Sequence, residues 1–134
     1  MFNYRFDNRL IRFNKNNINF NVKNKKIHSV DLNLINPEEI YDFIKDKNGI
    51  MDLIIKTHLL IKEYFPNAEL YLKLHDDPES DEPKYKLFTH ILNDGNTAYE
   101  NVCIFDDLLS EFVVLKSSFP DLILNYSIII GLNP

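Results

Sequence analysis

Apolar and polar residues alternate along much of the first 35 residues, a pattern typical of short β-strands. Ile18, Phe20 and Val22 alternate with asparagines, and the alternation resumes at Leu32 and Leu34. Residues spaced in this way present one face to a core and the other face to water. The sequence therefore predicts three or four short antiparallel strands in this segment.

Two helices are predicted after these strands. Asn36 is expected to cap the first helix, Pro37 suits its first turn, and two glutamates follow near the positive end of the helix dipole. A polar break at 45–49 then separates it from a second helix, predicted from about Ile50 to Tyr64. Apolar residues recur near helical spacing along this second helix.

The second half of the chain predicts a hairpin, a third helix and a final strand. Residues 70–75 and 85–92 alternate strictly and are expected to pair as a β-hairpin. The string "TAYE" at 97–100 is a capping box, which marks the start of a helix. The run 122–130 is rich in β-branched residues and predicts a strand buried on both faces. The third helix is expected to direct inward Val102, Cys103, Phe105, Leu108, Leu109 and Phe112.

The predicted order is three or four strands, two helices, two strands, one helix and one strand. This order is typical of an α+β fold with a mostly antiparallel sheet and about three helices on one face. The chain has 134 residues, of which 45% are hydrophobic. We expect a single domain over 1–134, with a basic β-rich part at 1–35 and an acidic α+β part at 36–134.

The net charge of −5 is unevenly distributed along the chain. Residues 1–35 carry a net +5 and the remainder a net −10. The favoured interpretation is that the two parts attract each other within one fold. The alternative is a nucleic-acid-associated regulator, because aromatic side chains interleaved with cations on a sheet can stack bases and hold phosphates. The cations of this alternative are Arg5, Arg9, Arg12, Lys15, Lys23, Lys25 and Lys26.

An acidic cluster lies between the two strands of the predicted hairpin, in "YLKLHDDPESDEPKYKLF". The cluster has two prolines and no glycine, so it does not fit a calcium-binding loop, which needs a glycine at its sharp turn. We interpret it as an exposed hairpin tip that repels edge-to-edge association, with no metal bound. Under the hypothesis of a protein-binding module, its carboxylates are the expected contacts with a basic partner. Its carboxylates are Asp76, Asp77, Glu79, Asp81 and Glu82.

Catalytic and metal-binding motifs are not recognisable in the sequence. The four histidines have no ligand spacing, and a hairpin symmetric about its loop separates His75 from His90 by several residue pairs. His28 and His58 have no ligand neighbours, and Cys103 is expected to be a buried structural thiol. Three glycines cannot form a Walker loop or a Rossmann fingerprint. No cofactor is expected, and a dispersed enzyme site around His58 or Cys103 is the third hypothesis.

Two strings resemble a group of small uncharacterised bacterial proteins that are frequent in cyanobacteria. They are "IKEYFPNAELYLKLHDDPE" at 61–79 and "TAYENVCIFDDLL" at 97–109. The shared pattern joins "YFP", alternating leucines, "DPE" and a later helix containing "FD", over about residues 50–130. The resemblance implies an α+β fold and no assigned activity, so it transfers no site residues.

The sequence as a whole favours a non-enzymatic protein-binding module. An antitoxin-like or immunity-like inhibitor fits this type, because it needs a complementary surface rather than a catalytic constellation. A homodimer formed through an exposed strand edge is compatible with this function. We expect a cytoplasmic protein with no membrane contact, because no apolar run approaches about 20 residues and the start does not resemble a signal peptide.

Overall fold

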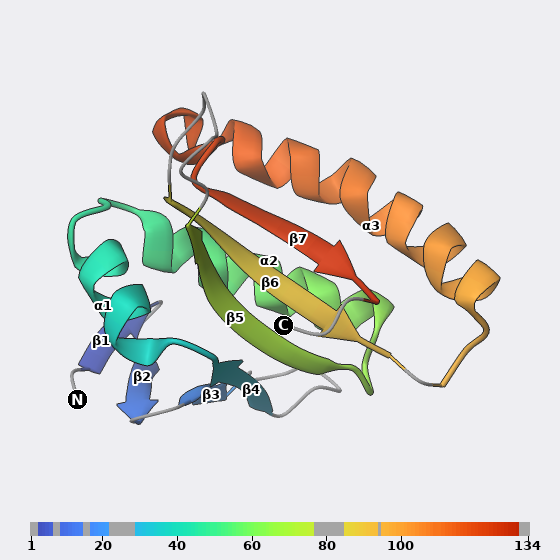
Figure 1. The fold of residues 1–134 in the computed structure, drawn as a ribbon, viewed down its shortest axis with the longest axis horizontal. Coiled ribbons are helices and arrows are strands. Elements are labelled where there is room, and N and C mark those ends of the chain that lie inside the picture. The colour runs from blue at the N-terminus through green and yellow to red at the C-terminus, as the bar shows by residue number, and fades with distance from the viewer. Residues whose placement is uncertain are drawn as a thin grey trace.

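The computed structural model describes residues 3–6, 9–14, 17–21, 29–76, 85–93 and 95–131. All of the strands in these residues belong to one sheet. Its strands lie side by side in chain order from β1 to β7 (Figure 1). They are β1 (Asn3–Phe6), β2 (Arg9–Asn14), β3 (Asn17–Asn21), β4 (Ser29–Leu34), β5 (Glu69–Asp76), β6 (Tyr85–Leu92) and β7 (Tyr126–Ile130). The helices are α1 (Pro37–Lys45), α2 (Ile50–Tyr64), α3 (Ala98–Ser117) and a 3₁₀ turn, η1 (Pro120–Leu122).

The predicted α+β class and element order are confirmed, but the sheet is mixed rather than mostly antiparallel. Strand β4 pairs with β5 in parallel, and so does β6 with β7. Parallel neighbours need a long crossover connection, which α1 and α2 supply in the first case and α3 in the second. The alternation within a strand carries no information on the direction of its neighbour, so the sequence did not reveal these two pairs.

One face of the sheet is covered by helices and holds the core. Leu72, Thr89 and Ile128 are register partners across β5, β6 and β7, and all three are buried. Figure 1 shows α2 behind β5 and β6. Phe112 of α3 packs edge-on against Tyr126 of β7, with ring centroids 6.0 Å apart. The helices contribute to this core through Ile40, Ile44, Ile50, Leu53, Ile54, Ile61, Leu108 and Phe112, among others.

Asn36 extends the sheet instead of capping α1. It makes no side-chain capping bond. Its Nδ2 donates to the carbonyl oxygen of Leu74 at 2.9 Å, and the backbone N–H of Leu74 donates to its Oδ1 at 3.0 Å. Asn36 therefore occupies the predicted N-cap position of α1, but its side chain does not cap the helix. The amide side chain takes the place of a strand residue beside β5 just beyond the end of β4.

The capping box of α3 is confirmed, but the orientation predicted for its first turns is not. The backbone N–H of Glu100 donates to Thr97 Oγ1, and the Thr97 N–H donates to Glu100 Oε1. Val102 and Cys103 are exposed rather than directed inward. Apolar residues occur on more than one side of this helix, so helical spacing alone did not identify the buried side.

The last strand is shorter and less buried than predicted. It begins at Tyr126, because η1 occupies part of the run that was expected to be extended. Tyr126 and Ile128 are buried, whereas Ser127 and Ile129 are only half-buried. The reason is that β7 lies at one end of the strand order and has helices on one face only.

Replacing Asn36 tests whether its side chain completes the sheet. Asp caps a helix about as well as Asn, but its carboxylate cannot donate to Leu74 O. We therefore expect both Asn36→Asp and Asn36→Ala to lower the free energy of unfolding by about 1–2 kcal/mol, measured by urea denaturation. A fully stable Asn36→Asp variant would indicate a capping role instead.

Candidate functional site

A chain of hydrogen bonds crosses the core between α2 and the sheet. His58 Nδ1 donates to the carbonyl oxygen of Ile54 at 2.6 Å, which leaves Nε2 as an acceptor. Thr89 Oγ1 lies 3.1 Å from this Nε2 and donates its proton there. The hydroxyl of Tyr126 then donates to Thr89 Oγ1 at 2.6 Å. The three side chains are buried, and each polar group in the chain has a partner.

This environment makes His58 a structural residue. Burial lowers the pKa of His58 to about 4, which outweighs the opposing effect of its bond to Ile54. Burial also raises the pKa of Tyr126. His58 has no exposed surface, so a substrate cannot reach its ring without opening the core.

The outer side of α2 and α3 carries an open groove of about 630 Å³. Leu59 and Leu60 of α2 and Val114 and Leu115 of α3 form its apolar part. Its polar lining residues are Lys56, Glu63, Ser110 and Glu111. A second hollow, of about 420 Å³, lies at the turn between α1 and α2. Neither hollow is lined by His58 or Cys103.

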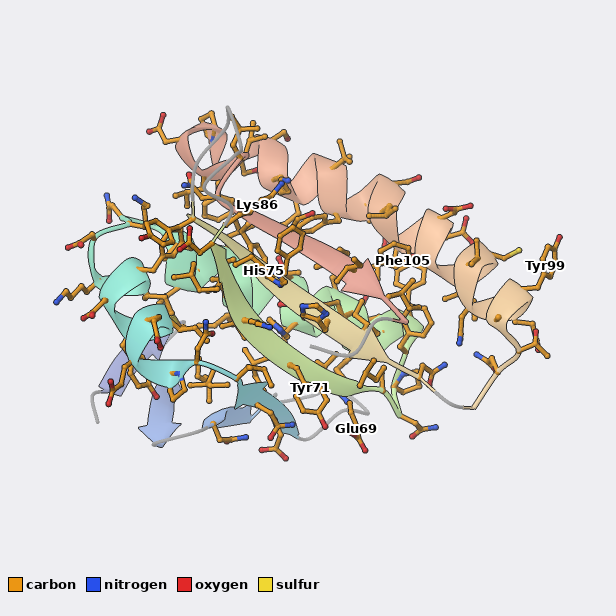
Figure 2. The ribbon with its side chains drawn as sticks, in the orientation of Figure 1. Glu69, Tyr71, His75, Lys86, Tyr99 and Phe105 are labelled. Atoms are coloured by element: carbon orange, nitrogen blue, oxygen red, sulfur yellow. The ribbon has the colours of Figure 1, made fainter. Side chains whose placement is uncertain are left out.

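Exposed apolar side chains occur at the α3 side of this groove and at the distant start of the same helix. Val113 and Val114 are 65% and 68% exposed, and Tyr99 is 78% exposed. Figure 2 shows Tyr99 at the start of α3, directed away from the sheet. Only Leu108 and Phe112 of this 20-residue helix are fully buried. The surface formed by these exposed residues and the groove is called the α2–α3 face below.

Carboxylates border the α2–α3 face. Glu63 and Glu111 line the groove opposite a single lysine, Lys56. The Tyr64 hydroxyl donates to Glu111 Oε2 at 2.6 Å, which joins α2 to α3. This hydrogen bond raises the pKa of Tyr64 to about 12. The groove is therefore apolar at its centre and has an excess of negative charge at its rim.

Two histidines meet on the opposite face of the sheet, which no helix crosses in front of β5 and β6 in Figure 1. The Nε2 atoms of His75 and His90 lie 3.1 Å apart. Their rings meet end to end, with centroids 5.3 Å apart and ring planes 26° apart, and Phe88 packs edge-on against His75 at 4.8 Å. Lys86 Nζ lies 5.4 Å from the centre of the Phe88 ring. Figure 2 places His75 near the middle of this face.

The two histidines are separated by several residue pairs, as expected, but the predicted register is wrong and the rings are in contact. His75 pairs with Lys86 and His90 with Tyr71, so the register is shifted by two residues from the symmetric hairpin. The residues are four positions apart along the strands, yet their rings reach each other. Burial, together with the charge of Lys73, lowers the pKa of His75. The alternation of 70–75 indicated the correct face, but no signal in the sequence indicated the contact.

The other predicted site residues are only partly described. Asp76 is exposed at the end of β5, whereas Asp77, Glu79, Asp81 and Glu82 lie outside the described residues. Arg5 lies on β1 and Arg9 and Arg12 on β2, in strands that join the sheet through β3. Lys15, Lys23, Lys25, Lys26 and His28 also lie outside the described residues. Cys103, expected to be buried, is an exposed free thiol.

In the described part of the chain, no group of three or more His, Cys, Asp and Glu side chains is placed to hold a metal ion. No helix within the described ranges is long and apolar enough to cross a membrane. No protein-family model, curated protein or solved structure matches the chain.

Stability is expected to fall as the pH is lowered from about 6.5 to about 4, because of His58. Its pKa in the folded protein lies below its ordinary value of 6.5, so in this range the unfolded chain binds a proton that the folded chain does not. The loss from this residue is about 3 kcal/mol. Urea denaturation across this range measures it. His58→Gln should reduce the pH dependence, and an unchanged slope in that variant would contradict the assignment.

Proposed function

We propose that the protein is a non-enzymatic binding module that recognises another protein through its α2–α3 face. The single observation that carries this proposal is the concentration of exposed apolar side chains on α3 beside an open apolar groove. Contiguous exposed apolar surface is typical of interaction sites, because its contact with water is unfavourable until a partner covers it.

The charge of the groove supports a basic partner segment. An apolar groove with a polar rim suits an amphipathic helix, whose apolar side chains fill the groove. Glu63 and Glu111 at the rim favour lysines or arginines on the edges of that helix. The exposed Asp76, at the end of β5, is the one described member of the acidic hairpin cluster.

Antitoxin-like and immunity-like inhibitors act in this manner, by occupying a surface of their target. Such a mechanism needs shape and charge complementarity and no catalytic group. The buried, fully hydrogen-bonded state of His58 agrees with a structural rather than a chemical role for the core histidine. We place the module in the cytoplasm, because a free surface thiol such as Cys103 persists in reducing compartments.

Two matched substitutions test the α2–α3 face. Val114 lines the groove, whereas Leu124 is exposed elsewhere. Tagged wild-type protein is expected to capture one stoichiometric protein from native lysate, and the captured protein should survive nuclease treatment. Val114→Glu should reduce capture by at least about tenfold, because it places a charge in the centre of the interface. Leu124→Glu should leave capture unchanged.

Three results would contradict the proposal, and each indicates a different alternative. Equal capture by Val114→Glu and the wild type would show that another surface makes the contact. Capture that is lost with nuclease would favour the nucleic-acid alternative and the basic strands β1 and β2. Capture of a second copy of the chain would identify a homodimer, which sedimentation would confirm.

Cys103 gives an independent readout, because it is the only cysteine in the chain and lies on α3. By helical spacing it shares a side of the helix with Val114. A photoreactive group attached to Cys103 is expected to cross-link the captured partner. The control is Cys103→Ser combined with Ser127→Cys, which moves the same group to the opposite face of the sheet. Equal cross-linking from both positions would contradict the assignment of the α2–α3 face.

A further inference from the structure

The contact between His75 and His90 brings two metal-ligating nitrogens to one point. Both rings present Nε2, and the two atoms are 3.1 Å apart. Two nitrogens bound to one zinc ion through bonds of 2.0–2.1 Å at a tetrahedral angle lie about 3.4 Å apart. The observed spacing is close to this value, but the centroid distance of 5.3 Å shows that the two nitrogens point at each other. Each ring must therefore tilt so that both lone pairs meet at one ion.

The two rings are held in place before any ion binds. His90 is 3% exposed, and His75 meets it end to end through the Nε2 atoms and packs edge-on against Phe88. Side chains that are already ordered lose little conformational entropy when they bind a ligand. The helix-free face leaves His75 half-buried, so water can reach this side of the pair and complete the coordination.

In the absence of metal, the two nitrogens share one proton. One Nε2–H donates to the other Nε2, because two unprotonated nitrogens at this distance would repel each other. An ion bound by both nitrogens lies to one side of the line between them, because bonds of 2.0–2.1 Å do not fit on that line, and the shared proton is displaced. The donor ring then carries its proton on Nδ1 instead, so neutral rings bind the ion without net proton release.

The chemistry of the pair selects a class of ion. Imidazole nitrogens suit Zn²⁺, Ni²⁺ and Cu²⁺, whereas Mg²⁺ and Ca²⁺ require oxygen ligands. The ammonium groups of Lys73 and Lys86 on the same face oppose a cation. With two protein ligands and these positive neighbours, the site should bind more weakly than a structural zinc site with four ligands.

We infer that His75 and His90 form a binding site for a divalent transition metal ion of the zinc class, on the helix-free face of β5 and β6. The α2–α3 face lies on the other side of the sheet, so this site and the proposed partner surface are independent.

Titration calorimetry of the full chain with zinc chloride tests the inference. We expect one ion per chain, and no binding of magnesium at the same concentrations. His75→Gln and His90→Gln should each raise the Kd for zinc by about tenfold or more, because each removes one of two ligands.

A further variant distinguishes this site from adventitious zinc binding. Lys73→Gln keeps both histidines and removes a nearby positive charge, so it should lower the Kd by about two- to fivefold. Circular dichroism checks that each variant is folded, and His75→Gln decides the result if the nearly buried His90 cannot be replaced. Two results would overturn the inference. One is that the wild-type chain does not bind zinc at a zinc concentration of about 1 mM. The other is that His75→Gln leaves the Kd for zinc unchanged.

Discussion

The hydroxyl group of Thr89 fixes how α2 and β7 fit against the centre of the sheet. It donates to His58 and accepts from Tyr126, at distances of 3.1 and 2.6 Å. Apolar contacts tolerate small displacements, but hydrogen bonds weaken steeply when their length or angle changes. Because His58, Thr89 and Tyr126 are buried, a displaced α2 would weaken hydrogen bonds between buried polar groups. The bond chain therefore helps to determine the position of α2, whereas α3 is positioned by the buried side chains of Leu108 and Phe112.

Two surfaces of different chemistry result from this arrangement. Helices cover one face of the sheet, and their outer side is apolar with acidic edges. The other face of β5 and β6 presents aromatic rings, imidazoles and ammonium groups. On the outer side of the helices, affinity for a protein partner would come from the burial of apolar area. On the other face of the sheet, affinity for a metal ion would come from the lone pairs of the imidazole nitrogens. A substitution on one face leaves the other intact, because the sheet and the core lie between them.

Features that depend on neighbouring residues were predictable from the sequence. The capping box of Thr97 and Glu100, the bounds of α2 and the alternation of β5 all follow from local spacing. Features that depend on contacts between residues far apart in the sequence were not predictable. The parallel pairs, the bonds from Asn36 to Leu74 and the meeting of His75 with His90 arise from register, which alternation leaves undetermined. The exposure of Cys103 was missed because the apolar residues of α3 surround the helix.

The order of strand pairing has a consequence for how the chain folds. The β5–β6 hairpin joins strands that are close in sequence and pairs eight residues on each strand. Strands β4 and β7 pair with it in parallel across helical crossovers, so their contacts close much longer loops and carry a larger entropic cost. We therefore expect the hairpin to form early and to act as the template on which β4 and β7 later align. Substitutions in the hairpin would then slow folding, whereas substitutions in β7 would mainly accelerate unfolding.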